Sequence, residues 1–121
     1  MMNRSPDPVQ LLRGFAMGFP QASEGVACEG TSVEKRTIKA REKAFLFLGS
    51  TDAIFKLEGS LSEAATLASA EPTRYKVGSG GWVTATFHPN DTPAMDRLER
   101  WVDESFRANA NQRLVAMLDE E

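Results

Sequence analysis

The sequence predicts an α+β fold in two layers, a five-stranded antiparallel sheet with helices on one face. Three observations predict it. Apolar residues recur at helical spacing near both ends of the chain, short strand-like runs lie between them, and turn-forming residues separate these runs at close intervals. Such short connections favour antiparallel neighbours, because parallel strands need a long crossover. The expected order is α-β-β-β-α-β-β-α, in a single domain over residues 1–121.

The first helix is predicted to begin after Asp7, a good N-cap residue, with Pro8 at its first position. Gly18 and Pro20 end it. Its apolar stripe comprises Val9, Leu12, Phe15, Ala16 and Phe19. The following stretch, residues 21–31, mixes small and polar side chains and is interpreted as a loop or a poor edge strand.

Five strands are predicted by alternation and by the turn residues around them, at residues 36–40, 44–48, 53–57, 73–77 and 82–87. The second of these is apolar on both faces, which is typical of a central strand. Residues 78–81, with three glycines, are expected to form the hairpin loop between the last two strands.

Two further helical regions are predicted. Ser60 followed by Glu63 forms a capping box, and that helix stops before Pro72. The next helix is expected to have Thr92 as N-cap and Pro93 as its first residue. Its buried stripe is Met95, Leu98, Trp101, Val102 and Phe106, and it is followed by a short helix or a bent continuation with Leu114, Val115 and Leu118.

Composition indicates a globular domain, with 41% apolar and 26% charged residues in 121. The one cysteine, Cys28, cannot form an internal disulfide, and no apolar run approaches the roughly 18 residues that a membrane span needs. We therefore expect a cytoplasmic protein with no membrane partner. The net charge of −3 gives no overall attraction to nucleic acid.

Residues suited to catalysis or metal binding are few. His88 has no Cys or His partner at the spacing of metal ligands, and Cys28 lies beside Glu29 rather than beside a base. The glycines of residues 78–81 lack the Gly-Lys-Ser/Thr ending of a phosphate-binding loop. We expect no enzyme activity, no metal and no cofactor.

A candidate site emerges when the strands are phased. The apolar residues expected to face the helices are Ile38, Phe55, Leu57, Tyr75, Val77, Val83, Ala85 and Phe87. Alternation then places the others on the opposite side, here called the open face. These are Thr37, Lys39, Ile54, Lys56, Arg74, Lys76, Trp82, Thr84 and Thr86. Four bases beside a tryptophan suit an anionic ligand that can stack, although lysine and threonine are also ordinary residues on the solvent face of a strand.

Several short strings of residues also have a familiar order and spacing over about residues 9 to 110. They are Gly18-Phe19-Pro20, Cys28-Glu29-Gly30-Thr31-Ser32-Val33-Glu34, Lys43-Ala44-Phe45-Leu46-Phe47-Leu48, Glu71-Pro72-Thr73-Arg74-Tyr75-Lys76-Val77, Gly81-Trp82-Val83 and Trp101-Val102-Asp103-Glu104-Ser105-Phe106. In these strings the chain resembles the MmcQ/YjbR family of small bacterial proteins. The resemblance implies a two-layer fold of the secretion-chaperone-like kind. The family is commonly labelled DNA-binding, a label that rests largely on fold similarity.

One feature of the family cannot be carried over. Other members often have a histidine beside the Gly-Trp-Val strand, where this chain has Gly80 and Gly81. The leading hypothesis is a non-enzymatic DNA-binding module in which Lys39, Lys56, Arg74 and Lys76 contact phosphate and Trp82 stacks or packs. The alternative is a protein-interaction or chaperone-like module, with an apolar groove or dimer surface formed by Ile54, Trp82 and the C-terminal helix. In either case we expect a monomer or a weak dimer.

Overall fold

A computed structural model describes residues 7–27, 30, 35–88, 94–110 and 112–119. In this part of the chain an antiparallel sheet is formed by six strands, β1 (Ala22–Ala27), β2 (Lys35–Ala40), β3 (Lys43–Leu48), β4 (Asp52–Lys56), β5 (Tyr75–Val77) and β6 (Trp82–Thr86). Their order across the sheet is β1-β2-β3-β4-β6-β5. The predicted α+β class and antiparallel sheet are confirmed, whereas the number of strands differs.

The additional strand is β1, in the stretch left open as a loop or a poor edge strand. It pairs with β2 along its whole length, from Ala22 opposite Ala40 to Ala27 opposite Lys35. Its alanines, serine and glycine have little intrinsic preference for a strand. The ladder to β2 therefore stabilises this conformation, and the prediction of five strands is wrong by one.

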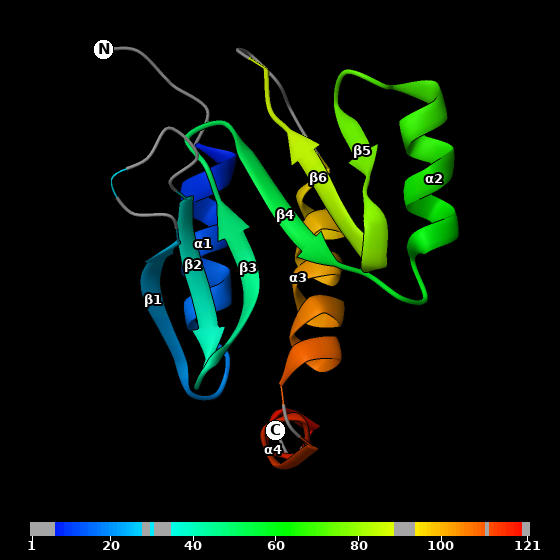
Figure 1. Cartoon of the computed structure of the whole chain (residues 1–121). Coiled ribbons are helices and arrows are strands. Elements are labelled where there is room, and N and C mark those ends of the chain that lie inside the picture. The colour runs from blue at the N-terminus through cyan, green and yellow to red at the C-terminus, as the bar shows by residue number, and fades with distance from the viewer. Residues whose placement is uncertain (1–6, 28–29, 31–34, 89–93, 111, 120–121) are drawn as a thin grey trace.

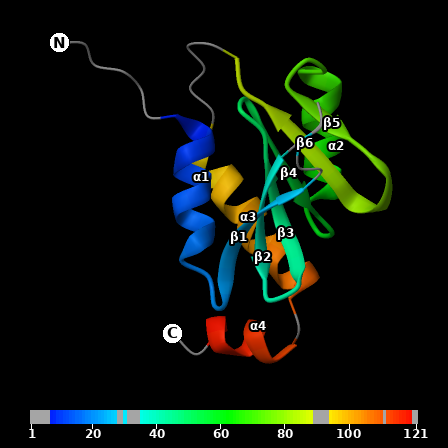
Figure 2. The same ribbon diagram turned by 60° about the vertical axis from the view of Figure 1, so that its left-hand side comes forward.

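The described helices are α1 (Pro8–Met17), α2 (Leu61–Ala70), α3 (Met95–Asn109) and α4 (Gln112–Asp119). Figures 1 and 2 show α1 and α3 against one face of the sheet, α2 along the β5 edge and α4 at one end of the molecule. Asp7 caps α1 as predicted, since its Oδ1 accepts a bond of 3.0 Å from the Val9 N–H. Thr92 and Pro93, the predicted start of the next helix, lie outside the described residues.

The core lies between the sheet and these helices. One aromatic cluster joins the turn after α1 to β3 and α3 through the rings of Phe19, Phe45 and Phe106, and a second joins β4, β5 and α3 through Phe55, Tyr75 and Trp101. The residues expected to face the helices are buried, with one exception. Val77, at the end of the short edge strand β5, is 39% exposed, because little of the fold extends past it.

The predicted capping box of α2 is wrong. The Ser60 side chain makes no capping bond, and its hydroxyl donates to Glu104 of α3 at 2.7 Å. Glu63 accepts hydrogen bonds from Arg100 and from the indole of Trp101, each at 3.1 Å. Both side chains are thus hydrogen-bonded to residues of α3, which come 37 to 44 positions later in the chain. These bonds tie α2 to α3.

A bulge in β3 shapes the middle of the sheet. Ile38 pairs with Leu46 but Lys39 pairs with Ala44, so Phe45 is the extra residue. Phe45 and Leu46 are consequently both buried. Beyond the last pair of the β3–β4 ladder, Ser105 of α3 bridges these two strands, donating to the Phe45 carbonyl and accepting from the Lys56 N–H at 2.8 Å. The last position of β4 is thus held from the helix-covered face.

Candidate functional site

The register of the six strands places a continuous row of residues across the open face. The middle row runs from β1 to β5 as Gly25, Thr37, Phe47, Ile54, Thr84 and Lys76. Residues paired directly across antiparallel strands share a face of the sheet. The row therefore brings together four of the residues that phasing assigned to this face, and it adds Phe47 at its centre.

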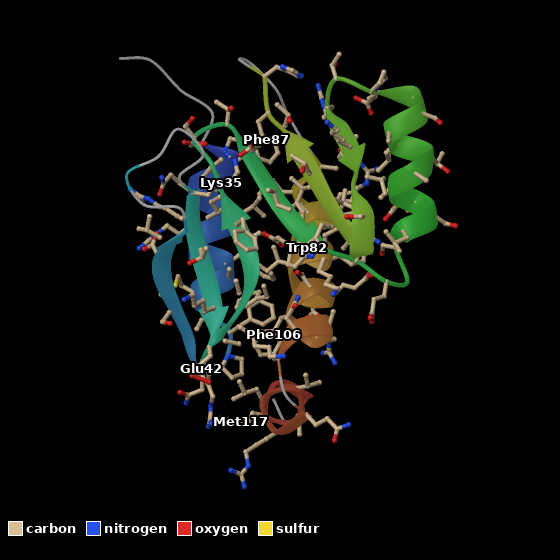
Figure 3. The ribbon with its side chains drawn as sticks, in the orientation of Figure 1. Lys35, Glu42, Trp82, Phe87, Phe106 and Met117 are labelled. Atoms are coloured by element: carbon tan, nitrogen blue, oxygen red, sulfur yellow. The ribbon has the colours of Figure 1, made fainter. Side chains whose placement is uncertain are left out.

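A shallow hollow of about 610 Å³ lies on this face, over the row's centre and its β5 end. Phe47, Ile54 and Trp82 give it an apolar floor, and it is completed by Lys76, Gly78, Ser79 and Thr84. The Phe47 and Trp82 rings meet edge to face, with centroids 5.5 Å apart and an interplanar angle of 77°. Figure 3 shows Trp82 at the start of β6, beside the end of β4. Half-buried rings in such a hollow can contact a planar ligand.

Lys56 adds a positive charge to the hollow. It pairs with Trp82 across β4 and β6, and its Nζ lies 5.7 Å from the centre of the Trp82 ring. At this distance the ammonium is attracted to the face of the indole. The Ser105 hydroxyl holds the Lys56 backbone from the other side of the sheet. The core therefore fixes the backbone position from which the Lys56 side chain extends over the tryptophan.

Lys39 and Lys76 lie toward opposite sides of the same face. Lys39 is opposite Ser23 of β1, and Lys76 is opposite Thr84 of β6 and exposed. Among the described residues, neither these two lysines nor Lys56 has a carboxylate within salt-bridge distance. Three ammonium groups thus remain available on the open face: Lys76 lines the hollow, Lys56 lies over Trp82, and Lys39 lies on β2 outside the residues that line the hollow.

Arg74, the remaining predicted site residue, is placed differently. Its Nε lies 3.5 Å from Glu71 Oε1, and its side chain is 25% exposed. Glu71 caps the end of α2. Arg74 therefore lies at the margin of the sheet beside that helix and is not among the residues that line the hollow. It is the one predicted site residue whose charge is engaged by a carboxylate of the described fold.

Sequence reasoning missed a charged pair on the open face. Lys35 Nζ lies 3.1 Å from Asp52 Oδ1, and both atoms lie close to Gly49 in the turn between β3 and β4. A Cβ on Gly49 would clash with that Asp52 oxygen, so a larger residue there would displace the Asp52 carboxylate from Lys35. The alternation of β2 could have indicated Lys35, two residues before Thr37. Asp52 neutralises Lys35 on this side of the middle row, whereas Lys39 and Lys56 lie on the other side and Lys76 lies in the row itself.

Sequence reasoning also missed Phe47. The apolar character of residues 44–48 on both faces was the signal, because half of such a strand must face away from the helices. The bulge at Phe45 shifts the alternation, so the sequence alone left the open-face member of this strand unassigned. The structure pairs Phe47 with Ile54 and brings its ring against Trp82.

Other candidate chemistry is limited in the described part of the chain. His88 is exposed, with its Nε2 3.3 Å from the Thr73 carbonyl oxygen, and Cys28 lies outside the described residues. No three His, Cys, Asp or Glu side chains that the structure describes gather as metal ligands would. None of the described helices is long and apolar enough to cross a membrane.

The alternative surface requires one correction. It was expected to combine Ile54 and Trp82 with the C-terminal helix, but no described residue of α4 lines the hollow. Instead, α4 buries Leu114 in the core at the end of the molecule. An apolar groove on the open face is therefore formed by strands and by the β5–β6 connection.

Comparison of the chain with protein-family models, with curated proteins and with solved structures gives no match.

Proposed function

We propose that this chain is a non-enzymatic binding module of the MmcQ/YjbR kind, acting in the cytoplasm, that holds DNA in single-stranded form on the open face. The observation that carries the proposal is the Phe47–Trp82 pair in a hollow lined by Lys76, with Lys56 over the Trp82 ring; neither lysine has an acidic partner among the described residues. Proteins that bind single strands combine aromatic surfaces for the bases with cations for the backbone. Trp82 would stack on a base while Lys39, Lys56 and Lys76 contact phosphate.

The shape of the site favours a single strand over a duplex. Reading the major groove requires a helix or a two-stranded ribbon that enters it. Here the helices α1 and α3 lie behind the sheet, and the six strands form one continuous surface (Figure 2). In a duplex the faces of the bases are hidden by stacking, whereas unpaired bases can lie flat on exposed rings.

The overall charge supports a contribution from stacking. At −3 the chain repels a polyanion at long range, so contacts to phosphate alone would give weak binding. Stacking on an aromatic side chain is worth about 1–3 kcal/mol per base. Trp82 would therefore supply a large part of the affinity, and the three lysines would orient the backbone around it.

The test is a fluorescence-anisotropy titration with single-stranded DNA, single-stranded RNA and duplex DNA at two salt concentrations. We expect the single strands to bind more tightly than the duplex. We also expect the logarithm of the affinity to fall with the logarithm of the salt concentration with a slope of about −2, since each phosphate contact of a single strand contributes about −0.7. Trp82→Ala should weaken binding by about 1–3 kcal/mol.

A second candidate function follows from the apolar floor of the hollow. Phe47, Ile54 and Trp82 also suit the apolar side chains of a protein partner. Such docking releases few counterions, so its affinity would change little with salt. If the wild-type protein binds no nucleic acid at low salt, the nucleic-acid proposal is wrong and the protein-interaction function takes its place.

A further inference from the structure

The two edges of the sheet differ in how they are protected. At one edge β5 has only three residues, carries Lys76 at its centre and is flanked by α2. At the other edge β1 has six residues, with no lysine, no proline and no irregularity in its register with β2. Figures 1 and 2 show no other described element beyond the outer side of β1. Soluble proteins usually protect such an edge against pairing with another strand.

The hydrogen-bonding pattern identifies the backbone groups that face outward. The Arg41 N–H donates to the Gln21 carbonyl, so this pair of residues is hydrogen-bonded. Hydrogen-bonded and non-hydrogen-bonded pairs alternate in an antiparallel ladder, which makes Gly25–Thr37 a hydrogen-bonded pair as well. The N–H and C=O groups of Glu24 and Val26 therefore point away from β2, where another strand can pair with them.

The side chains of β1 allow close approach. Its one charged residue, Glu24, is held by Arg13 at 2.7 Å and by Arg36 at 3.6 Å. The hydrogen bond from Arg13 keeps the pKa of Glu24 below its ordinary value, so the carboxylate stays charged and paired. Val26 is 49% exposed. The edge thus presents backbone groups that pair with no described strand, an exposed valine and a carboxylate already neutralised.

We propose that β1 pairs with β1 of a second copy of this chain, antiparallel, about a two-fold axis at Gly25. In this register Glu24 lies opposite Val26 of the partner subunit, and the outward backbone groups of both residues are satisfied. A register with Glu24 opposite Glu24 of the partner subunit would oppose like charges, which is destabilising. The Gly25 register is therefore the favoured symmetric pairing.

Charge complementarity favours a second copy over an unrelated strand. Arg36 pairs with Val26 on β2 and its side chain is 60% exposed. In the Gly25 register it shares a face with Glu24 of the partner subunit, one strand further on, and can form an additional ion pair there. The two-fold axis repeats this pair, because an isologous interface uses every contact twice.

The pairing would also align the two candidate sites. Directly paired residues lie on the same face, so the open faces of both copies would look to the same side of one continuous sheet. The dimer itself needs no nucleic acid. A failure of the dimer proposal can therefore be distinguished from a failure of the proposed function, because assembly is measured in the absence of ligand.

The first test is sedimentation velocity of the full chain over a range of protein concentrations. We expect the wild type to form dimers and Val26→Lys to be monomeric, because a lysine in the strand hinders edge pairing. The matched control is Val77→Lys, which introduces the same residue at an exposed valine of the opposite edge and should still form dimers. A wild type that is monomeric at every concentration, or a Val77→Lys that dissociates while Val26→Lys does not, overturns the proposal.

The second test addresses the register, in a Cys28→Ser background. Gly25 would face Gly25 of the partner subunit in a non-hydrogen-bonded pair, with Cα atoms about 4.5 Å apart, within reach of a disulfide. A new Cβ at Gly25 would lie 3.2 Å from Thr37 Oγ1, which requires only a small shift. Gly25→Cys should cross-link on mild oxidation, and the control Ser23→Cys should not. Equal cross-linking of both variants, or of neither, overturns the register.

Discussion

Trp101 and Trp82 lie on opposite faces of the same sheet and have opposite surroundings. Trp101 is fully buried on the helix-covered face, its indole N–H donates to Glu63, and its ring packs against Phe55 and Tyr75. Trp82 is half-buried on the open face, where it contacts Phe47 and carries the Lys56 ammonium above its ring. One tryptophan has its hydrogen bond and its packing within the fold, and the other retains surface for a ligand.

The same contrast extends to the charged residues. On the helix-covered side, Glu63 and Glu104 accept hydrogen bonds from neighbouring elements and join α2 to α3. On the open face, Lys39, Lys56 and Lys76 have no such partner among the described residues. Substitutions on the helix-covered side should therefore change stability, whereas substitutions on the open face should change binding.

The largest effect on stability is expected for Trp101→Ala. Removing a fully buried tryptophan that packs against two aromatic rings should lower the free energy of unfolding by about 3–5 kcal/mol. Trp82→Ala, on the open face, should cost about 1 kcal/mol. Urea denaturation followed by circular dichroism gives both values.

Trp101→Phe serves as the milder variant if Trp101→Ala does not fold, and it should still be less stable than Trp82→Phe. Equal losses for the two tryptophans would show that the open face is part of the structural core. That result would contradict the separation of the two faces.

Ser105→Ala should give the next largest loss. The hydroxyl bridges the Phe45 carbonyl of β3 and the Lys56 N–H of β4 where the β3–β4 ladder ends, beside the bulge between β2 and β3. Leaving the buried Phe45 carbonyl without this donor costs about 1–3 kcal/mol, and the part-buried Lys56 N–H adds less because water can reach it. We further expect faster hydrogen exchange at the Lys56 amide in this variant. Unchanged stability and exchange would mean that a water molecule replaces the hydroxyl at no cost.

Lys39→Glu combined with Lys76→Glu should act on binding and leave folding intact. Substitutions of exposed or half-exposed residues usually change stability by no more than about 0.5 kcal/mol. The affinity for single-stranded DNA should fall, and the salt slope should flatten by about 0.7 for each lost contact.

The matched control for this variant is Lys43→Glu with Arg113→Glu. Both residues are exposed away from the open face, and the change in net charge is the same. If the control weakens binding as much as the test variant, long-range charge rather than the open face determines the affinity.

Acid should weaken the contact between α2 and α3. Burial alone would raise the pKa of Glu104, but hydrogen bonds from the Ser60 hydroxyl and the backbone N–H groups of Glu58 and Ser60 outweigh it and lower the pKa. A lowered folded-state pKa gives stability that is present above the unfolded value, about 4.3, and is lost as the pH falls through the folded value.

Glu104→Gln should therefore be less stable than the wild type at pH 7, and the difference should shrink below about pH 4. Thermal melts at a series of pH values measure it. A difference that stays constant down to pH 2 would assign the loss to packing instead of charge.

The smallest effect is expected for Cys28→Ser and His88→Ala. The proposed binding uses neither side chain, and His88 is exposed two residues after β6 and does not line the hollow. Both variants should bind single-stranded DNA with wild-type affinity. A folded variant that loses binding would indicate that the protein has chemistry beyond stacking and phosphate contact.

Much of the fold could be predicted because local signals agreed with it. Asp7 and Pro8 start α1, turn residues separate the strands, and alternation assigns Trp82 and Val83 to opposite faces. β1 was not assigned because its residues have low strand propensity and the strand depends on its ladder to β2. Contributions from pairing partners are not visible in a local window of sequence.

The site could be predicted only in part for a similar reason. Phasing identified Lys39, Lys56, Lys76 and Trp82, since strand period alone places them. It could not show that Glu71 engages Arg74, because that depends on where α2 ends beside β5. The capping-box error at α2 has the same origin, as a partner from another helix competes for the side chain.

The central claim, that the open face binds the ligand and the helix-covered face does not, is tested most directly by the two tryptophans. Their indole N–H groups give separate signals in a ¹⁵N-labelled sample titrated with a short single-stranded DNA. We predict that the Trp82 signal shifts with saturation, together with the amides of Ile54 and Thr84, while the Trp101 signal, held by Glu63, stays in place. A Trp82 signal that does not move at saturation, or shifts confined to Trp101 and its neighbours, would contradict the account.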